Sequence, residues 1–126
     1  MPKLYHIIFP YSEYMPEFYR VSFDAEELEA LRRACALQSG REDRLLDEAA
    51  SGPLEGVVAQ EKKADDVLLI KSTVSIFKPG QAILITEEDL RLMRGCLEGY
   101  KGESPSELSE AIDSAIRKID AAEPVA

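Results

Sequence analysis

Short segments in which hydrophobic and polar positions alternate predict strands. Residues 3–9 (KLYHIIF) are mostly apolar on both faces of an extended chain, as expected of a central strand. Residues 19–23 alternate apolar and polar positions, which is typical of a half-buried strand. Two apolar runs, residues 55–60 and 67–77, flank the polar sequence KKADD, and we interpret them as a hairpin. Residues 82–85 follow a Pro-Gly turn and predict the next strand.

Other segments space their apolar residues as amphipathic helices do. Asp24 is a strong N-cap, and Glu27 stands at the capping-box position behind it. The helix that they begin is expected to end at Gly40, because glycine often terminates a helix. A shorter helix over residues 41–50 is expected to follow and to end before a Gly-Pro pair.

Two further helices are predicted in the second half of the chain. Thr86 caps the first of them, and three acidic residues in its first turn complement the helix dipole. Residues 104–107 (SPSE) form a capping box for the second, with proline at the first helical position. The tail from residue 121 onward is expected to fray.

These elements predict an α+β fold. We expect an antiparallel sheet of about five strands, with about four helices packed largely on one face. A chain of 126 residues is long enough for one hydrophobic core and too short for two independent ones, so residues 1–126 are expected to form a single domain.

The chain also resembles itself at an offset of 62 residues. Residues 21–32 align with residues 83–94, and without a gap Gly40 then falls on Gly102. One interpretation is an internal duplication with a pseudo-twofold axis between half-repeats 1–62 and 63–124. The other is that any strand that leads into a capped helix has a similar sequence.

The excess of acidic over basic residues disfavours some kinds of binding partner. The chain has 15 basic and 24 acidic residues and a net charge of -9. Its cations are scattered, so direct binding to nucleic acid or to an anionic membrane surface is disfavoured. The acidic surface serves solubility, and it would also suit a protein partner with a basic surface.

Cysteine usage and the N-terminus predict a cytoplasmic protein. Cys35 and Cys96 are too few for a disulfide scaffold, and both are expected to be buried, free thiols within helices. The apolar stretch after Met1 is short and is not followed by a small-residue cleavage site, so no secretory signal is expected.

The sequence contains no catalytic, cofactor-binding or metal-binding signature. His6, the single histidine, lies between apolar neighbours and is expected to be a core residue. One histidine and two distant cysteines do not complete a zinc site, and no phosphate-binding glycine loop is present. The acidic clusters stand at predicted helix starts, where the helix dipole already favours them.

Aromatic residues are concentrated near the N-terminus. Tyr11, Tyr14 and Phe18, together with Met15, lie in a proline-bounded segment that we interpret as a loop. Large aromatic side chains on a loop are suited to anchoring a protein interface, and we take these four as candidate partner-binding residues. The alternative is that the loop covers the sheet as part of the core.

Three functions are compatible with these features. The first is a small regulatory, adaptor or inhibitor protein that acts through protein–protein interaction without catalysis. The second is a small-molecule-binding or enzymatic domain with a cleft between the two halves; the sequence permits a homodimer and leaves the oligomeric state open. The third is an anionic mimic of nucleic acid that blocks a nucleic-acid-binding protein.

Overall fold

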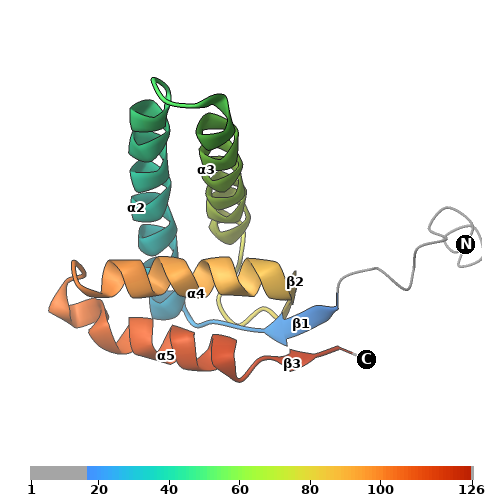
Figure 1. The fold of residues 1–126 in the computed structure, drawn as a ribbon. Helices are drawn as coiled ribbons and strands as arrows, with labels where there is room; N and C mark the ends of the chain where they lie inside the picture. The colour runs from blue at the N-terminus through green and yellow to red at the C-terminus, as the bar shows by residue number, and fades with distance from the viewer. Residues whose placement is uncertain (1–16, 126) are drawn as a thin grey trace, which may run out of the picture.

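A small antiparallel sheet lies at one end of the structure, a computed structural model that describes residues 17–125 (Figure 1). In this range the strands are β1 (Phe18–Val21), β2 (Ile83–Thr86) and β3 (Glu123–Pro124), in the order β2-β1-β3. Tyr19 on the central strand is paired with Ile85 on one side and with Pro124 on the other. The sheet therefore joins the start, the middle and the end of the described chain.

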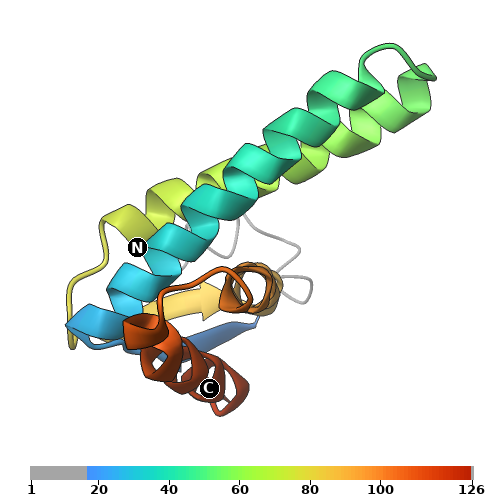
Figure 2. The same cartoon turned by 90° about the vertical axis from the view of Figure 1, so that its left-hand side faces the viewer.

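Four α-helices make up most of the described residues. They are α2 (Ala25–Ala49), α3 (Leu54–Ser75), α4 (Glu87–Lys101) and α5 (Ser109–Asp120), with a single 3-10 turn, η2 (Ser106–Leu108), before the last of them. α2 and α3 form a long hairpin that projects away from the sheet, α4 and α5 (Figure 2). At 1.5 Å per residue, the 25 residues of α2 span about 37 Å.

The hydrophobic core lies where the base of this hairpin meets the sheet, α4 and α5. One face of the sheet contributes Val21, Ile83 and Ile85, all less than a tenth exposed. The largest fully buried apolar side chains of the helices are Leu28, Leu31, Ile70, Val74, Met93, Leu97 and Ile112. The core therefore contains residues from all four described α-helices, and the outer part of the hairpin extends beyond it.

The predicted hairpin of strands at residues 55–60 and 67–77 is wrong, because this segment is the helix α3. Its buried residues, Ala64, Val67, Ile70 and Val74, recur every three or four positions and face α2. Other apolar residues, Leu54, Val58, Leu68 and Leu69, lie on the exposed side, so apolar residues are not confined to one face of the helix. That pattern hides the helical period and resembles a pair of buried strands.

The two helices predicted over residues 24–40 and 41–50 are one continuous helix. Gly40 lies inside α2 and does not end it, whereas Gly102 is the C-cap of α4. The alignment of Gly40 with Gly102 in the predicted repeat therefore matches two structurally different positions. Packing along α3 stabilises α2 past Gly40 and outweighs the helix-breaking tendency of one glycine.

The prediction of about five strands is also wrong. Residues 19–23 and 82–85 do contribute β1 and β2, and residues 3–9 lie outside the described residues. The third described strand is β3, in the tail that was expected to fray. Its residues pair with β1, and the amide of Val125 donates a hydrogen bond to the carbonyl of Phe18 at 2.7 Å. The mixture of helices and antiparallel strands agrees with the α+β class.

The predicted starts of α2 and α4 are confirmed. The Asp24 carboxylate accepts the amide of Glu27 at 2.8 Å, and Glu27 accepts the amide of Asp24 at 2.8 Å, which completes the capping box. The hydroxyl of Thr86 accepts the amide of Asp89 at 3.2 Å. The predicted capping box at residues 104–107 does not form, because Ser104 donates to the carbonyl of Lys101 instead.

The turn before β2 has the predicted form. The amide of Gln81 donates to the carbonyl of Lys78 at 3.1 Å, and Gly80 has a φ of 76°. Pro79 precedes this glycine, as in a type II turn, where the third residue needs a positive φ. The Gly80 amide also donates to the carbonyl of Phe23 at 2.8 Å, which joins the turn to the end of the first strand.

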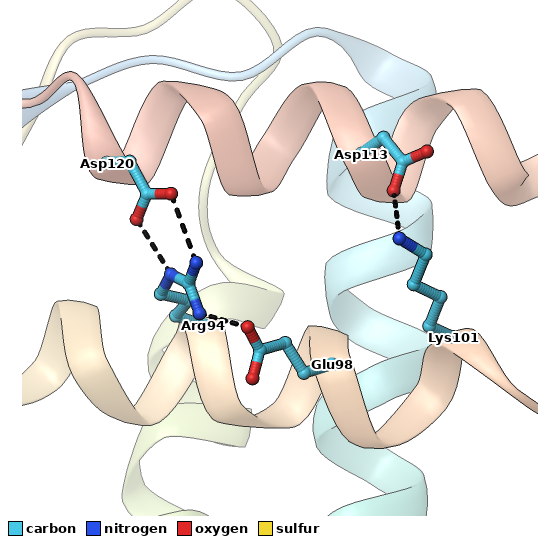
Figure 3. A network of polar contacts seen from close by, with 5 residues as sticks. All are labelled: Arg94, Glu98, Lys101, Asp113 and Asp120. Carbon is cyan, nitrogen blue, oxygen red and sulfur yellow. Dashed lines mark hydrogen bonds and ion pairs between the residues drawn. The ribbon is translucent and has the colours of Figure 1, made fainter.

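Ion pairs connect α4 to α5 on the surface (Figure 3). Arg94 donates two hydrogen bonds to Asp120, at 2.7 and 3.2 Å, and also contacts Glu98 one turn along its own helix. Lys101 pairs with Asp113 at 2.9 Å nearer the other end of the two helices. These ion pairs connect the two helices. Because they are solvent-exposed, each adds little to the free energy of unfolding.

Candidate functional site

Of the four candidate partner-binding residues, only Phe18 falls within the part of the chain that the structure describes. Tyr11, Tyr14 and Met15 lie outside the described residues. Phe18 begins β1 and does not belong to a loop, and 40% of it is exposed. Successive side chains of a strand point to opposite faces. Val21, three positions after Phe18, points into the core, so the side chain of Phe18 lies on the opposite face of the sheet.

The sheet face that carries Phe18 is open among the described residues. Arg20 on β1 is paired with Leu84 on β2, and both point away from the buried row of Val21 and Ile83. Leu84 is 57% exposed. The open face is therefore partly apolar, with one cation between two large apolar side chains.

A second exposed apolar surface lies at the outer end of the α2–α3 hairpin. We call residues 43–63 the hairpin tip. None of these residues is buried, although they include the last turns of α2 and the first turns of α3. Leu45, Leu54 and Val58 are 46%, 76% and 58% exposed. In Figure 2 the tip stands well clear of the sheet, α4 and α5, so within residues 17–125 its two helices have only each other to pack against.

Acidic side chains line a groove between the N-terminal end of α2 and α5. This acidic groove has a volume of about 520 Å³. Its ionisable lining residues are Asp24, Glu26, Glu27, Glu110 and Asp113, with Arg117 as the one base among them. The excess of carboxylates would attract a cationic group from a partner.

Glu27 is the buried member of this groove, and it joins α2 to α5. It is 1% exposed, and its carboxylate accepts hydrogen bonds from Lys118, at 2.5 Å, and from Ser114. Burial alone would raise the pKa of Glu27. The hydrogen bonds from Lys118, Ser114 and the Asp24 amide, with the charge of Lys118, outweigh it and lower the pKa below its ordinary value. Glu27 is thus a structural carboxylate, held ionised.

A further site lies between α2, α3 and α4. We call it the three-helix pocket; its volume is about 350 Å³. Its lining residues are Gln38, Glu42, Lys63, Asp66, Val67, Arg91, Leu92, Gly95 and Cys96. The apolar members and Cys96 come from the interior sides of α3 and α4, whereas the charged ends of Lys63 and Arg91 come from exposed residues. The pocket therefore combines an apolar floor with a charged rim.

Glu42 is the buried charged group of the three-helix pocket. It is 9% exposed, and its carboxylate accepts hydrogen bonds from Gln38 at 2.8 Å and from Gln60 at 2.6 Å. Among the described residues, no lysine or arginine forms an ion pair with it. Two neutral amides thus hold a carboxylate that a cationic ligand group could neutralise.

The two cysteines meet beside this pocket. Cys35 on α2 and Cys96 on α4 are both buried, and each thiol affects the pKa of the other. A hydrogen-bond interaction with Cys96, with burial, raises the pKa of Cys35. The same interaction lowers the pKa of Cys96, although burial and the nearby Glu42 carboxylate oppose the effect. Cys96 is therefore the more acidic thiol of the pair.

The sequence predicted that both cysteines would be buried in helices, but it did not show that they are neighbours. They lie 61 positions apart (96 less 35), and no spacing rule connects them. It also missed the hairpin tip, because residues 55–77 were predicted to form strands. The exposed pair Leu54 and Val58 has helical i,i+4 spacing, and this was the one available signal for the tip.

Within residues 17–125, no cluster of three or more metal-ligating side chains is arranged to hold a metal ion. No helix in this range has both the length and the apolar character that a membrane crossing requires. Comparisons with protein-family models, with curated proteins and with solved structures found no match to this chain.

Proposed function

We propose that this protein is a small interaction module, a regulatory, adaptor or inhibitor protein without catalysis, that docks onto a protein partner through the hairpin tip. One observation carries the proposal: residues 43–63 contain no buried residue, yet they hold three exposed large apolar side chains at the end of a projecting hairpin. Single exposed apolar residues are ordinary, but a group at the end of a projection favours contact with another molecule.

The free energy available from the exposed apolar side chains of the tip shows whether the partner must make further contacts. Leu45, Leu54 and Val58 are 46%, 76% and 58% exposed, so burying what remains exposed would contribute roughly 1–1.5 kcal/mol each, or about 4 kcal/mol together. Association costs about 4–15 kcal/mol in lost translational and rotational freedom. The apolar contact by itself is therefore insufficient for a tight complex, and we expect charge contacts to add to it.

The charge of the chain favours a partner with a basic surface. The net charge is -9, and the acidic groove still presents Asp24, Glu26 and Glu110 after its other two carboxylates, Glu27 and Asp113, have paired with Lys118 and Lys101. Opposite charge accelerates association and selects partners, and its effect falls as salt screens it. We also place the protein in the cytoplasm, where a reducing environment would keep the buried thiols of Cys35 and Cys96 free.

A capture experiment with two matched triple variants tests this proposal. The tip variant changes Leu45, Leu54 and Val58 to serine. The control variant changes three equally exposed apolar residues elsewhere, Leu68→Ser, Leu69→Ser and Leu84→Ser. Tagged full-length chains are used to capture proteins from a lysate of the source organism, and circular dichroism checks that each variant is folded.

The expected result is a specific protein that wild type and the control variant capture and the tip variant loses. Its binding, measured with the purified partner, should weaken as salt is raised, because the partner is expected to be basic. Equal capture by the tip and control variants would contradict a role for the tip. A third variant, Tyr11→Ser with Tyr14→Ser and Phe18→Ser, shows whether the aromatic segment anchors the same partner.

The three-helix pocket supports a second candidate function, the binding of a small molecule. Glu42 provides a buried carboxylate without an ion-pair partner among the described residues, in a cavity of about 350 Å³ with an apolar floor. A small organic cation with an apolar body fits this combination. Native mass spectrometry of the purified protein tests it: a retained ligand whose binding Glu42→Gln abolishes would favour this function.

A further inference from the structure

Cys35 and Cys96 are the two cysteines of the chain, and the fold brings them into contact. Each lies on the inner side of its helix, α2 or α4, and belongs to the hydrophobic core. Gln38, one turn beyond Cys35 on α2, lines the three-helix pocket together with Cys96, so α2 and α4 are in contact at the level of the two thiols. A disulfide needs the two sulfurs about 2.05 Å apart, which the thiols would reach by a movement of α2 against α4.

The two thiols differ in their access to the three-helix pocket. Cys96 lines the three-helix pocket, whereas Cys35 does not. Gly95, its neighbour in the pocket lining, has no side chain, and a Cβ added there would meet no atom within 4 Å. A small, uncharged molecule can therefore approach Cys96 through the pocket while Cys35 stays behind it.

The structure assigns a modification site: we propose that Cys35 and Cys96 form a dithiol that a small hydroperoxide converts into an intramolecular disulfide. The Cys96 thiolate attacks one oxygen of the hydroperoxide, which breaks the O–O bond and leaves a sulfenic acid on Cys96 and one molecule of alcohol or water. The sulfur of Cys35 then attacks the Cys96 sulfur. The S–S bond forms, the S–O bond breaks, and a second molecule of water leaves with the Cys35 proton. The two thiols lose two electrons in total, and the hydroperoxide gains them.

The order of the two steps follows from the positions of the thiols. Cys96 lines the pocket and Cys35 does not, so Cys96 supplies the thiolate that attacks first. Cys35 is the resolving cysteine, because it is the second thiol at the contact between α2 and α4. The product would link α2 to α4 and so fix the base of the projecting hairpin to the rest of the core.

Hydrogen peroxide is the probe for the test, with the full chain in native buffer and in its reduced form. Intact-mass spectrometry should show a loss of about 2 Da, and dithiothreitol should reverse it. A non-reducing digest should join the peptides that contain Cys35 and Cys96. In Cys35→Ser, dimedone should trap the sulfenic acid on Cys96, whereas Cys96→Ser should react at least about ten-fold more slowly than wild type.

Two pocket-access variants make the route testable. Gly95→Leu fills the pocket beside Cys96 and should slow oxidation several-fold. Gly40→Leu introduces the same side chain on α2, at an exposed position outside the pocket lining, and should leave the rate unchanged. Because either serine variant could fail to fold, wild type and these two leucine variants provide an independent comparison, with circular dichroism as the folding check.

Three results would overturn the proposal. The first is the absence of the −2 Da product in native buffer when the urea-unfolded chain forms it. The second is an oxidation rate that rises in proportion to the unfolded fraction as urea is added, since reaction would then require global unfolding. The third is equal oxidation of Gly95→Leu and Gly40→Leu, which would show that the three-helix pocket is not the route to Cys96.

Discussion

The buried carboxylate of Glu27 makes the sharpest prediction about stability. It is 1% exposed and accepts hydrogen bonds from the Asp24 amide, Ser114 and Lys118. The substitution Glu27→Gln keeps the size of the side chain and removes its charge. All three donors then lose a charged acceptor, while the backbone of the capping box stays in place.

The expected loss follows from these three hydrogen bonds. A hydrogen bond to a charged group contributes about 1.5–3 kcal/mol, and one between neutral groups about 0.5–1.5 kcal/mol. A loss of about 1 kcal/mol for each donor gives about 3 kcal/mol in the free energy of unfolding. Lys118 is 41% exposed at its side chain and can turn toward water, so we do not expect a further penalty for a buried, unpaired cation.

The pH dependence has a definite sign. Because the folded state lowers the pKa of Glu27, its contribution is present above the ordinary pKa of a glutamate and is lost as the pH falls through the lowered value. Urea titrations followed by circular dichroism should therefore give a difference between wild type and Glu27→Gln that shrinks between about pH 6 and pH 3.

Glu29→Gln is the matched control. Glu29 lies two residues further along α2, and its exposed pair with Arg33, at 2.9 Å, should contribute less than about 0.5 kcal/mol. A loss below about 1 kcal/mol for Glu27→Gln at neutral pH, or a difference that does not change on acidification, would refute the reasoning for Glu27.

Three further substitutions test the fold. Gly40→Ala should raise the free energy of unfolding by about 0.5–1 kcal/mol, because Gly40 lies inside α2 and an added Cβ meets no atom within 4 Å. A decrease in the free energy of unfolding would indicate that α2 ends at Gly40. Ile70→Ala should lower the free energy of unfolding, measured with urea, by about 2–5 kcal/mol, since Ile70 is 1% exposed on the inner side of α3. A loss as small as that of the exposed residue in Leu69→Ala would show that Ile70 does not face the core. Gly80→Ala should cost about 1–2 kcal/mol, because its φ of 76° strains any residue with a Cβ, and an unchanged melting temperature would contradict the type II turn.

The candidate surfaces were predictable only in part. The sequence singled out Phe18 as a candidate partner-binding residue on a loop; the structure gives it an exposure of 40% and puts it at the start of β1, and its role in binding stays a prediction. It did not show that Phe18 begins a strand that pairs with β2, because that pairing joins Phe18 to Thr86, 68 positions away (86 less 18). The hairpin tip and the three-helix pocket were missed for the same reason: both depend on where α3 lies.

The sequence by itself determined the features that form within a few residues of each other. Asp24 and Thr86 cap helices because each side chain reaches an amide only three positions away. The turn at residues 78–81 forms because proline restricts one φ angle and glycine permits the next. These local rules hold in both halves of the chain, whatever the rest of the fold does.

The tertiary structure decided the features that depend on distant partners. Residues 54–75 carry apolar residues on both the buried and the exposed side, and packing four of these residues against α2 selects the helix over a pair of strands. Gly40 stays helical because that same packing outweighs its propensity. β3 exists because β1 offers it an edge, and Cys35 meets Cys96 because α2 and α4 cross in the core. In each case the free energy that decides the conformation comes from burial between segments, which local sequence patterns do not contain.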